Sequence, residues 1–169
     1  MSLSSQVQPL GAVSVDPLEG FDPGRIYLIT EERMRFSQAL FQRLASSGRE
    51  VLCLSRMHPE MMQEKYQIDK DCAFWLSERH GPRSIAPGKL SLLRDRMGEF
   101  LEGKENAVVI LDGIEYLSIH NDFRKLNIFF EELNDLVMGS QAILLIPVDP
   151  RVFDRCSLAR LRRFAEVVG

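Results

Sequence analysis

The residues with the clearest chemical potential end a run of apolar side chains near the middle of the chain. The segment Ala107-Val-Val-Ile-Leu-Asp112 has the continuous apolar character of a strand that is buried on both faces. Such a strand delivers the Asp112 carboxylate to its carboxyl end, where a carboxylate can hold the Mg²⁺ of a bound nucleotide. That chemistry also needs a loop of the form GxxxxGK[ST], whose amides and lysine hold the phosphates. The 169 residues contain no such loop, so the sequence carries half of a nucleotide site and predicts no enzyme.

Other polar residues also fall on or just after the ends of predicted strands. Ligands of open parallel sheets collect beyond the carboxyl ends of the strands. One hypothesis is therefore a site for a small polar or phosphorylated ligand, formed by Thr30, Ser55, Arg56, Asp112, Gly113 and Asp149. The alternative is structural: Asp112 caps the following helix and pairs with Arg56. In either case Gly113 relieves crowding or permits an unusual backbone angle in this turn.

The C-terminal segment is rich in arginine, and we predict one helix from Val152 to Val168. Its arginines are interpreted either as a solvated basic face or as a docking site for an acidic partner protein, formed by Arg155, Arg162 and Arg163. The apolar side of the helix packs on the domain's own core or, as the alternative, on a second copy in a homodimer.

Composition sets broad limits on the function. A chain of 169 residues with a net charge of -3 suits one domain and gives no general reason to expect nucleic acid as a partner. The three cysteines are far apart and form no CxxC pair, so neither a disulfide framework nor a metal site is predicted, and a reducing cytoplasm fits best. No apolar stretch is long enough to span a membrane. Residues 1–22 are rich in Ser, Gln, Pro and Gly, which predicts a flexible leader before a single domain at 23–169.

Strands and helices alternate along the domain. Short apolar runs predict five strands, at 25–30, 51–55, 73–76, 107–112 and 142–147. Apolar residues at three- and four-residue spacing between these runs predict helices, including a long helical region after Asp112 that ends near Gly139. This pattern is typical of a three-layer α/β/α sandwich with a mainly parallel five-stranded sheet.

The order of the first elements resembles that of RecA-like and KaiC-like ATPases, in which the phosphate loop joins the first strand to the first helix. Here that connection is Thr30-Glu-Glu-Arg-Met-Arg35. Glu31 and Glu32 place two negative charges at the helix N-terminus, where they complement the helix dipole by about 0.3–1 kcal/mol each and repel a triphosphate. We therefore expect a degenerate scaffold of this kind without ATP binding.

A second resemblance covers nearly the whole chain from Gly24 onward. The ordered segments Leu54-Ser-Arg56, Trp75-Leu-Ser77, Val109-Ile-Leu-Asp-Gly-Ile-Glu-Tyr-Leu117 and Pro147-Val-Asp-Pro150 resemble the chiefly archaeal family of domains of unknown function number 835. Such domains often accompany the sensory modules of signalling proteins, so the resemblance implies a regulatory context. The expected function is a non-catalytic signalling module that binds a protein partner and no cofactor. The alternative is a regulatory domain that binds a small, nucleotide-like ligand at the carboxyl edge of the sheet.

Overall fold

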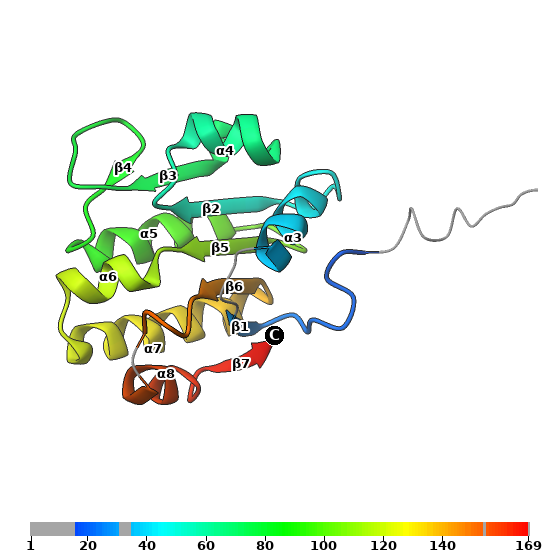
Figure 1. Cartoon of the computed structure of the whole chain (residues 1–169). Helices are drawn as coiled ribbons and strands as arrows, with labels where there is room; N and C mark the ends of the chain where they lie inside the picture. Colours follow the sequence, from blue (N-terminus) through cyan, green and yellow to red (C-terminus); the bar gives the residue numbers. More distant parts are fainter. Residues whose placement is uncertain (1–15, 31–34, 154, 169) are drawn as a thin grey trace, which may run out of the picture.

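A parallel β-sheet forms the centre of the protein and is covered by helices (Figure 1). The computed structural model describes residues 16–30, 35–153 and 155–168. Within this part of the chain the sheet has seven strands, in the order β4-β3-β2-β5-β6-β1-β7, and each neighbouring pair is parallel. The strands are β1 (Arg25–Thr30), β2 (Val51–Ser55), β3 (Ala73–Leu76), β4 (Ser84–Ile85), β5 (Val108–Asp112), β6 (Ile143–Val148) and β7 (Ala165–Val168). The prediction of a parallel α/β sheet is confirmed, and the predicted number of five strands is wrong.

Two layers of helices lie on opposite faces of the sheet, and each encloses its own apolar core. The first layer contains α3 (Arg35–Ala45) and α4 (Pro59–Tyr66), which pack on alternate strand residues such as Tyr27 and Cys53. The second contains α5 (Leu90–Leu101), α6 (Ile114–His120), α7 (Phe123–Ser140) and α8 (Arg155–Leu161), which pack on the opposite set, including Leu28 and Leu54. Side chains of successive strand residues point to opposite faces, so both faces need apolar residues and the central strands read as continuous apolar runs.

The predicted C-terminal helix is wrong in its second half. The helix α8 ends at Leu161, a turn follows, and residues 165–168 form the strand β7 beside β1, with Ile26 opposite Ala165 and Leu28 opposite Val167. The periodic apolar residues of this segment fit a helix when they are considered alone. Pairing with β1 decides the outcome, because a short strand takes its stability from its neighbours more than from its own sequence.

Two further boundaries differ from the predictions. The long helical region after Asp112 is divided at Asn121, and Asp122 starts α7 by accepting a hydrogen bond from the backbone N–H of Lys125 at 2.9 Å. In the expected leader, the described residues 16–22 pack on the domain: Leu18 is buried, and the ring of Phe21 meets that of Tyr27. The packed region therefore begins N-terminal to residue 23.

Candidate functional site

The candidate site lies at the carboxyl ends of β2 and β5, where the helices that follow two neighbouring strands diverge. The helix after β2 is α4 on one face of the sheet, and the helix after β5 is α6 on the other face. Such a divergence opens a crevice in parallel sheets, and ligands bind there in many α/β proteins. Ser55 and Asp112 are opposite each other in the register of β2 and β5, so both lie at this point of the carboxyl edge.

The Asp112 carboxyl group is held by the Ser55 hydroxyl. The Ser55 hydroxyl donates to Asp112 Oδ2 at 3.1 Å and accepts from the backbone N–H of Met57 at 2.9 Å. Burial raises the pKa of Asp112 to about 6, the charge of Glu115 acts in the same direction, and the hydrogen bond from Ser55 opposes them. The carboxyl edge therefore holds a carboxyl group that gains and loses its proton in the weakly acidic range.

Arg56 lies beside this carboxyl group but forms no ion pair with it within the described residues. Its backbone N–H donates to the Asp112 carbonyl at 3.2 Å, and its guanidinium donates to the Leu76 carbonyl. The same guanidinium stacks on Tyr116, with Cζ 3.8 Å from the ring centroid. The helix α6 starts at Gly113 with no side-chain cap. The alternative interpretation of Asp112, as a helix cap paired with Arg56, is therefore wrong.

Gly113 is required by both its backbone and its surroundings. Its φ is +148°, which side chains disfavour, and an added Cβ would lie 2.9 Å from Leu76 Cδ1 and 3.3 Å from Arg56 Cγ. Both roles that the sequence indicated for Gly113 are confirmed. Leu76 and Arg56 therefore pack directly against this turn and leave no room for a side chain at position 113.

The next polar group along the carboxyl edge is also internally bonded. Glu115 Oε2 accepts from the backbone N–H of Asp149 at 2.9 Å, which ties α6 to the end of β6. The Asp149 carboxylate accepts from the Arg151 backbone N–H and side chain at 2.9–3.1 Å, and these contacts hold the pKa of Asp149 below its ordinary value.

The six predicted ligand residues are not brought together as one group. Ser55, Arg56, Asp112 and Gly113 are in contact, and Glu115 links Asp149 to the adjoining helix. Thr30 ends β1, two strands away from β5, which is roughly 10 Å across the sheet. Its hydroxyl donates to the Val168 carbonyl at 3.4 Å. The acidic residues Glu31 and Glu32, on which the prediction against ATP binding depends, lie outside the described residues.

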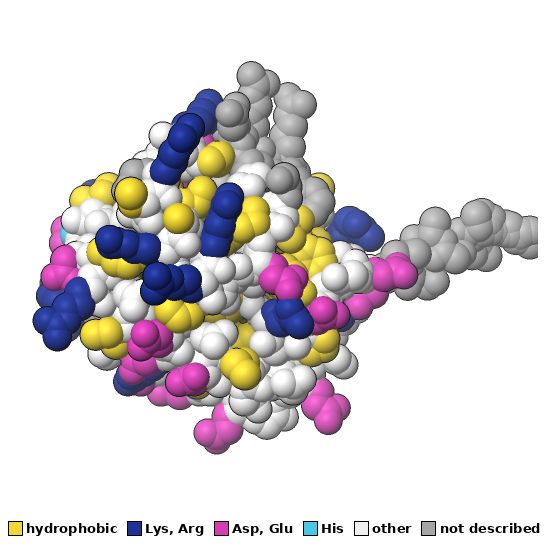
Figure 2. Space-filling model, turned by 90° about the horizontal axis from the view of Figure 1, so that it is seen from below, with side chains coloured by type: hydrophobic (Ala, Val, Ile, Leu, Met, Phe, Trp, Pro, Cys, Tyr) yellow, Lys and Arg dark blue, Asp and Glu magenta, His cyan; other side chains and the backbone are white. Residues whose placement is uncertain are grey.

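The basic residues near the C-terminus form a second candidate surface. Arg155, Arg162 and Arg163 are exposed, and within the described residues none of them is in an ion pair. Figure 2, which views the molecule from the side of α8 and β7, shows several Lys and Arg side chains among exposed hydrophobic ones, and acidic side chains also lie on this face. We call the surface formed by α8, β7 and the end of α7 the basic face.

A hollow of about 410 Å³ lies on the basic face. Its lining combines apolar, basic, acidic and amide side chains and includes Asn134, Met138, Arg162, Arg163, Phe164 and Glu166. Met138 is 56% exposed, which is unusual for a large apolar side chain, and Glu166 is paired with Arg25. Arg162 and Arg163 therefore lie together at a hollow of mixed polar and apolar lining, whereas Arg155, at the start of α8, does not line it.

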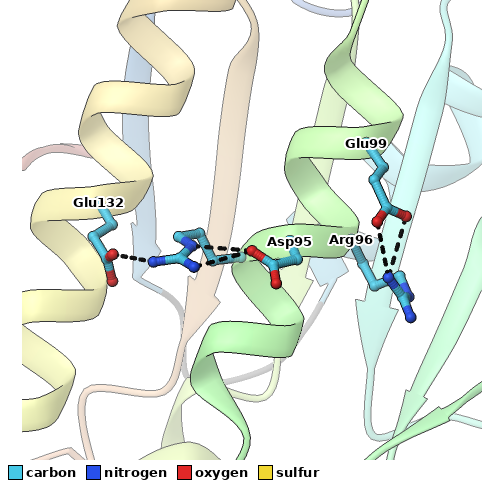
Figure 3. Close-up of polar contacts among 5 residues, drawn as sticks. Asp95, Arg96, Glu99 and Glu132 are labelled. Atoms are coloured by element: carbon cyan, nitrogen blue, oxygen red, sulfur yellow. Dashed lines mark hydrogen bonds and ion pairs between the residues drawn. The ribbon is translucent and has the colours of Figure 1, made fainter.

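Some arginines elsewhere on the surface are paired within the chain. On α5, Arg94 pairs with Asp95 and with Glu132 of α7, and Arg96 pairs with Glu99 (Figure 3). These guanidinium groups are neutralised within the chain, so they offer little charge to a partner. Exposed Arg43, Arg79 and Arg124 have no ion pair within the described residues either, so the basic face is defined by where its arginines lie together and not by the absence of ion pairs alone.

Several important residues were missed by the sequence analysis. Tyr116 and Leu76 hold Arg56 in place, and Met138 and Val167 supply exposed apolar surface on the basic face. Tyr116 follows Asp112 by four residues, a spacing that could have indicated it.

Among the described residues no group of three or more His, Cys, Asp or Glu side chains is placed to hold a metal ion. No described helix has the length and apolar content needed to cross a membrane.

Comparison with known proteins gives the family and the fold. The sequence model of the family described as a protein of unknown function, DUF835, matches residues 30–164. The chain belongs to this family. No curated protein matches it. A solved structure from a structural study of a Pyrococcus horikoshii OT3 protein is similar, with a TM-score of 0.57 and 12% identity over 88% of this chain and 82% of that one. At this identity the likeness shows the α/β fold alone.

Proposed function

We propose that this DUF835 domain is a non-catalytic regulatory module that binds a protein partner, built on a RecA-like scaffold without a phosphate-binding loop. The observation that carries the proposal is the basic face, where Arg155, Arg162 and Arg163 are exposed without ion pairs in the described residues and a hollow lies beside Met138. Exposed apolar surface next to unpaired charge of one sign is characteristic of a protein-binding surface. The partner surface would carry carboxylates opposite these arginines.

The carboxyl edge of the sheet supports the absence of catalysis. Arg56, Glu115 and Asp149 are each engaged by other groups of the chain, and Leu76 and Arg56 pack directly against Gly113. A nucleotide would have to displace these contacts and would find no glycine-rich loop to hold its phosphates.

A second candidate function is regulatory binding of a small polar ligand at the same edge. The specific observation in its favour is Asp112, whose carboxyl group is bonded within the described residues through one oxygen only, by Ser55, and whose pKa is raised to about 6 by burial. A shifted pKa in a crevice is a recognised feature of functional sites. A ligand that donates hydrogen bonds to the free oxygen would suit this position.

The partner hypothesis is tested with two baits, the wild type and the triple variant Arg155→Glu, Arg162→Glu and Arg163→Glu. Quantitative affinity capture followed by reconstitution from purified components should identify a protein that binds the wild type and is lost with the variant. Equal melting temperatures of the two baits would show that the variant is folded. A reconstituted partner that binds both baits equally would refute this role of the arginines.

The ligand hypothesis and residual catalysis are tested by adding ATP, GTP and cyclic nucleotides with and without Mg²⁺. The proposal expects neither turnover nor a saturable rise in melting temperature. A saturable rise that disappears in Asp112→Asn would promote the ligand-binding function. Turnover of ATP that disappears in the same variant would overturn the assignment as non-catalytic.

A further inference from the structure

Within the part of the chain that the structure describes, the outer edge of β7 is unpaired, and we propose that an acidic, extended segment of the partner protein adds to it as an eighth strand of the sheet. This inference rests on the proposed function and specifies how the partner is bound. Strand β7 is the last in the sheet order and pairs only with β1. Its outward N–H and C=O groups have no partner among the described residues, and such a row of groups is a template for another strand.

The two edges of the sheet differ in what they offer. At the other edge, β4 consists of Ser84 and Ile85 only, and the Ser84 N–H is already bonded to the Gly81 carbonyl at 3.2 Å. Strand β7 has four residues and is only partly buried along its length, with Val167 39% exposed. A longer edge with an exposed apolar side chain is the better site for an added strand.

The hollow on the basic face indicates the composition of the segment. Residues 162–166, which run from the turn after α8 into β7, line it. Arg25 and Ile26 of β1 line it as well, so the hollow lies on the β1 side of β7. A segment that pairs with the outer edge of β7 and continues past Ala165 would run beside Arg162 and Arg163 at the rim of the hollow. Met138 and Phe164 offer apolar surface to an apolar side chain of the segment, and Arg162 and Arg163 can form ion pairs with its carboxylates. Alternating apolar and acidic residues meet both requirements, because every second side chain of a strand points to the same face.

A second copy of this chain is a poorer occupant. If β7 paired with β7 across a two-fold axis, the incoming strand would bring a single carboxylate, that of Glu166. Glu166 already pairs with Arg25, and it lies on the opposite face of the strand from Val167. Self-association through β7 would therefore leave Arg162 and Arg163 without counter-charges, whereas an acidic segment supplies them.

The test uses a defined probe, a fluorescein-labelled peptide of alternating Glu and Val. Binding to the full chain is measured by fluorescence anisotropy. Hydrogen exchange then follows the amides of residues 165–168. We expect saturable binding and slower exchange in β7. We also expect loss of binding when alternate peptide nitrogens of the probe are methylated, because methylation removes the donors that a paired strand needs.

Two variants with equal charge change separate a local contact from bulk charge. Arg162→Glu with Arg163→Glu should weaken binding at least tenfold, or about 1.4 kcal/mol. Lys70→Glu with Arg79→Glu, exposed residues near β3 and β4 at the opposite edge, should leave the affinity within about twofold. Urea unfolding of both variants shows whether each is folded.

Several results would overturn the inference. These are no binding of the probe, equal binding of the methylated probe, equal weakening by both variants, unprotected β7 amides, or a peptide-free dimer that protects β7. The proposed function has a separate outcome. This outcome is a reconstituted partner that needs the three arginines and yet leaves the β7 amides unprotected. That result would refute the added strand but would leave the proposed protein-binding function standing.

Discussion

Replacement of Asp112 by Asn should stabilise the protein at neutral pH and leave it unchanged in acid. The carboxyl group is partly buried, and it accepts one hydrogen bond from Ser55. An amide keeps an oxygen acceptor for the Ser55 hydroxyl and never becomes charged. The substitution therefore removes the cost of a buried negative charge while it preserves the shape of the side chain.

The magnitude follows from the shift in the pKa. A rise from the ordinary value of 3.8 to about 6 corresponds to about 3 kcal/mol, at about 1.36 kcal/mol for each pH unit. The sign is fixed by proton binding: between these two values the folded state holds a proton that the unfolded chain has released. The free energy of unfolding of the wild type should therefore fall as the pH rises from 3.8 to about 6. Above that range the contribution of Asp112 to the free energy of unfolding should no longer change with pH.

Urea unfolding at a series of pH values measures this directly. Above about pH 7, Asp112→Asn should be more stable than the wild type by about 1–3 kcal/mol, and below pH 3.8 the two should coincide. Asp149→Asn is the matched control, because the contacts of Arg151 lower the pKa of Asp149. The stability that Asp149 contributes should be lost as the pH falls through its lowered pKa. If Asp112→Asn is destabilising at neutral pH, the reasoning about a costly buried charge is refuted.

Three further substitutions test the packing around the site by the urea midpoint at constant slope. Gly113→Ala should lower the free energy of unfolding by about 2–4 kcal/mol, because of the strained φ and the close approach to Leu76. Gly139→Ala, which has open space around it, should change the free energy of unfolding by less than about 1 kcal/mol. Similar effects of the two variants would contradict the geometry. Asn121→Ala should cost about 2–3 kcal/mol, because its side-chain amide donates to two carbonyls from a buried position, and a change below about 0.5 kcal/mol would show that water replaces it. Asp122→Ala should cost about 1 kcal/mol through loss of the cap of α7; no change would mean that the cap is not used in solution.

The central strands could be predicted because their signal is local. Strands β1, β2, β3, β5 and β6 are short runs of apolar residues bounded by polar or turn residues, and burial on both faces requires such runs. Gly113 was also predictable, since a glycine directly after a buried strand and before a helix indicates a tight turn. The placement of Ser55 and Asp112 at one edge followed from the parallel arrangement alone.

The contacts within the site could not be predicted in the same way. Arg56 was expected beside Asp112 and is beside it, yet its guanidinium bonds to Leu76 and stacks on Tyr116. Several acceptors lie within reach of a long arginine side chain, and the choice among them depends on small differences in geometry and desolvation. Those differences arise only after β3, β5 and α6 have packed together.

The sequence by itself determined the layers of this protein, because continuous apolar runs and helical periodicity act within a few residues. It also determined the absence of the GxxxxGK[ST] loop, and therefore that nucleotide chemistry lacks its usual support. Only the tertiary structure decided that residues 165–168 form a strand and that, among the described residues, the sheet ends in an unpaired edge beside Arg162 and Arg163. The physical reason is that β7 gains its hydrogen bonds and apolar contacts from β1, at the other end of the chain, and no local pattern records that partner.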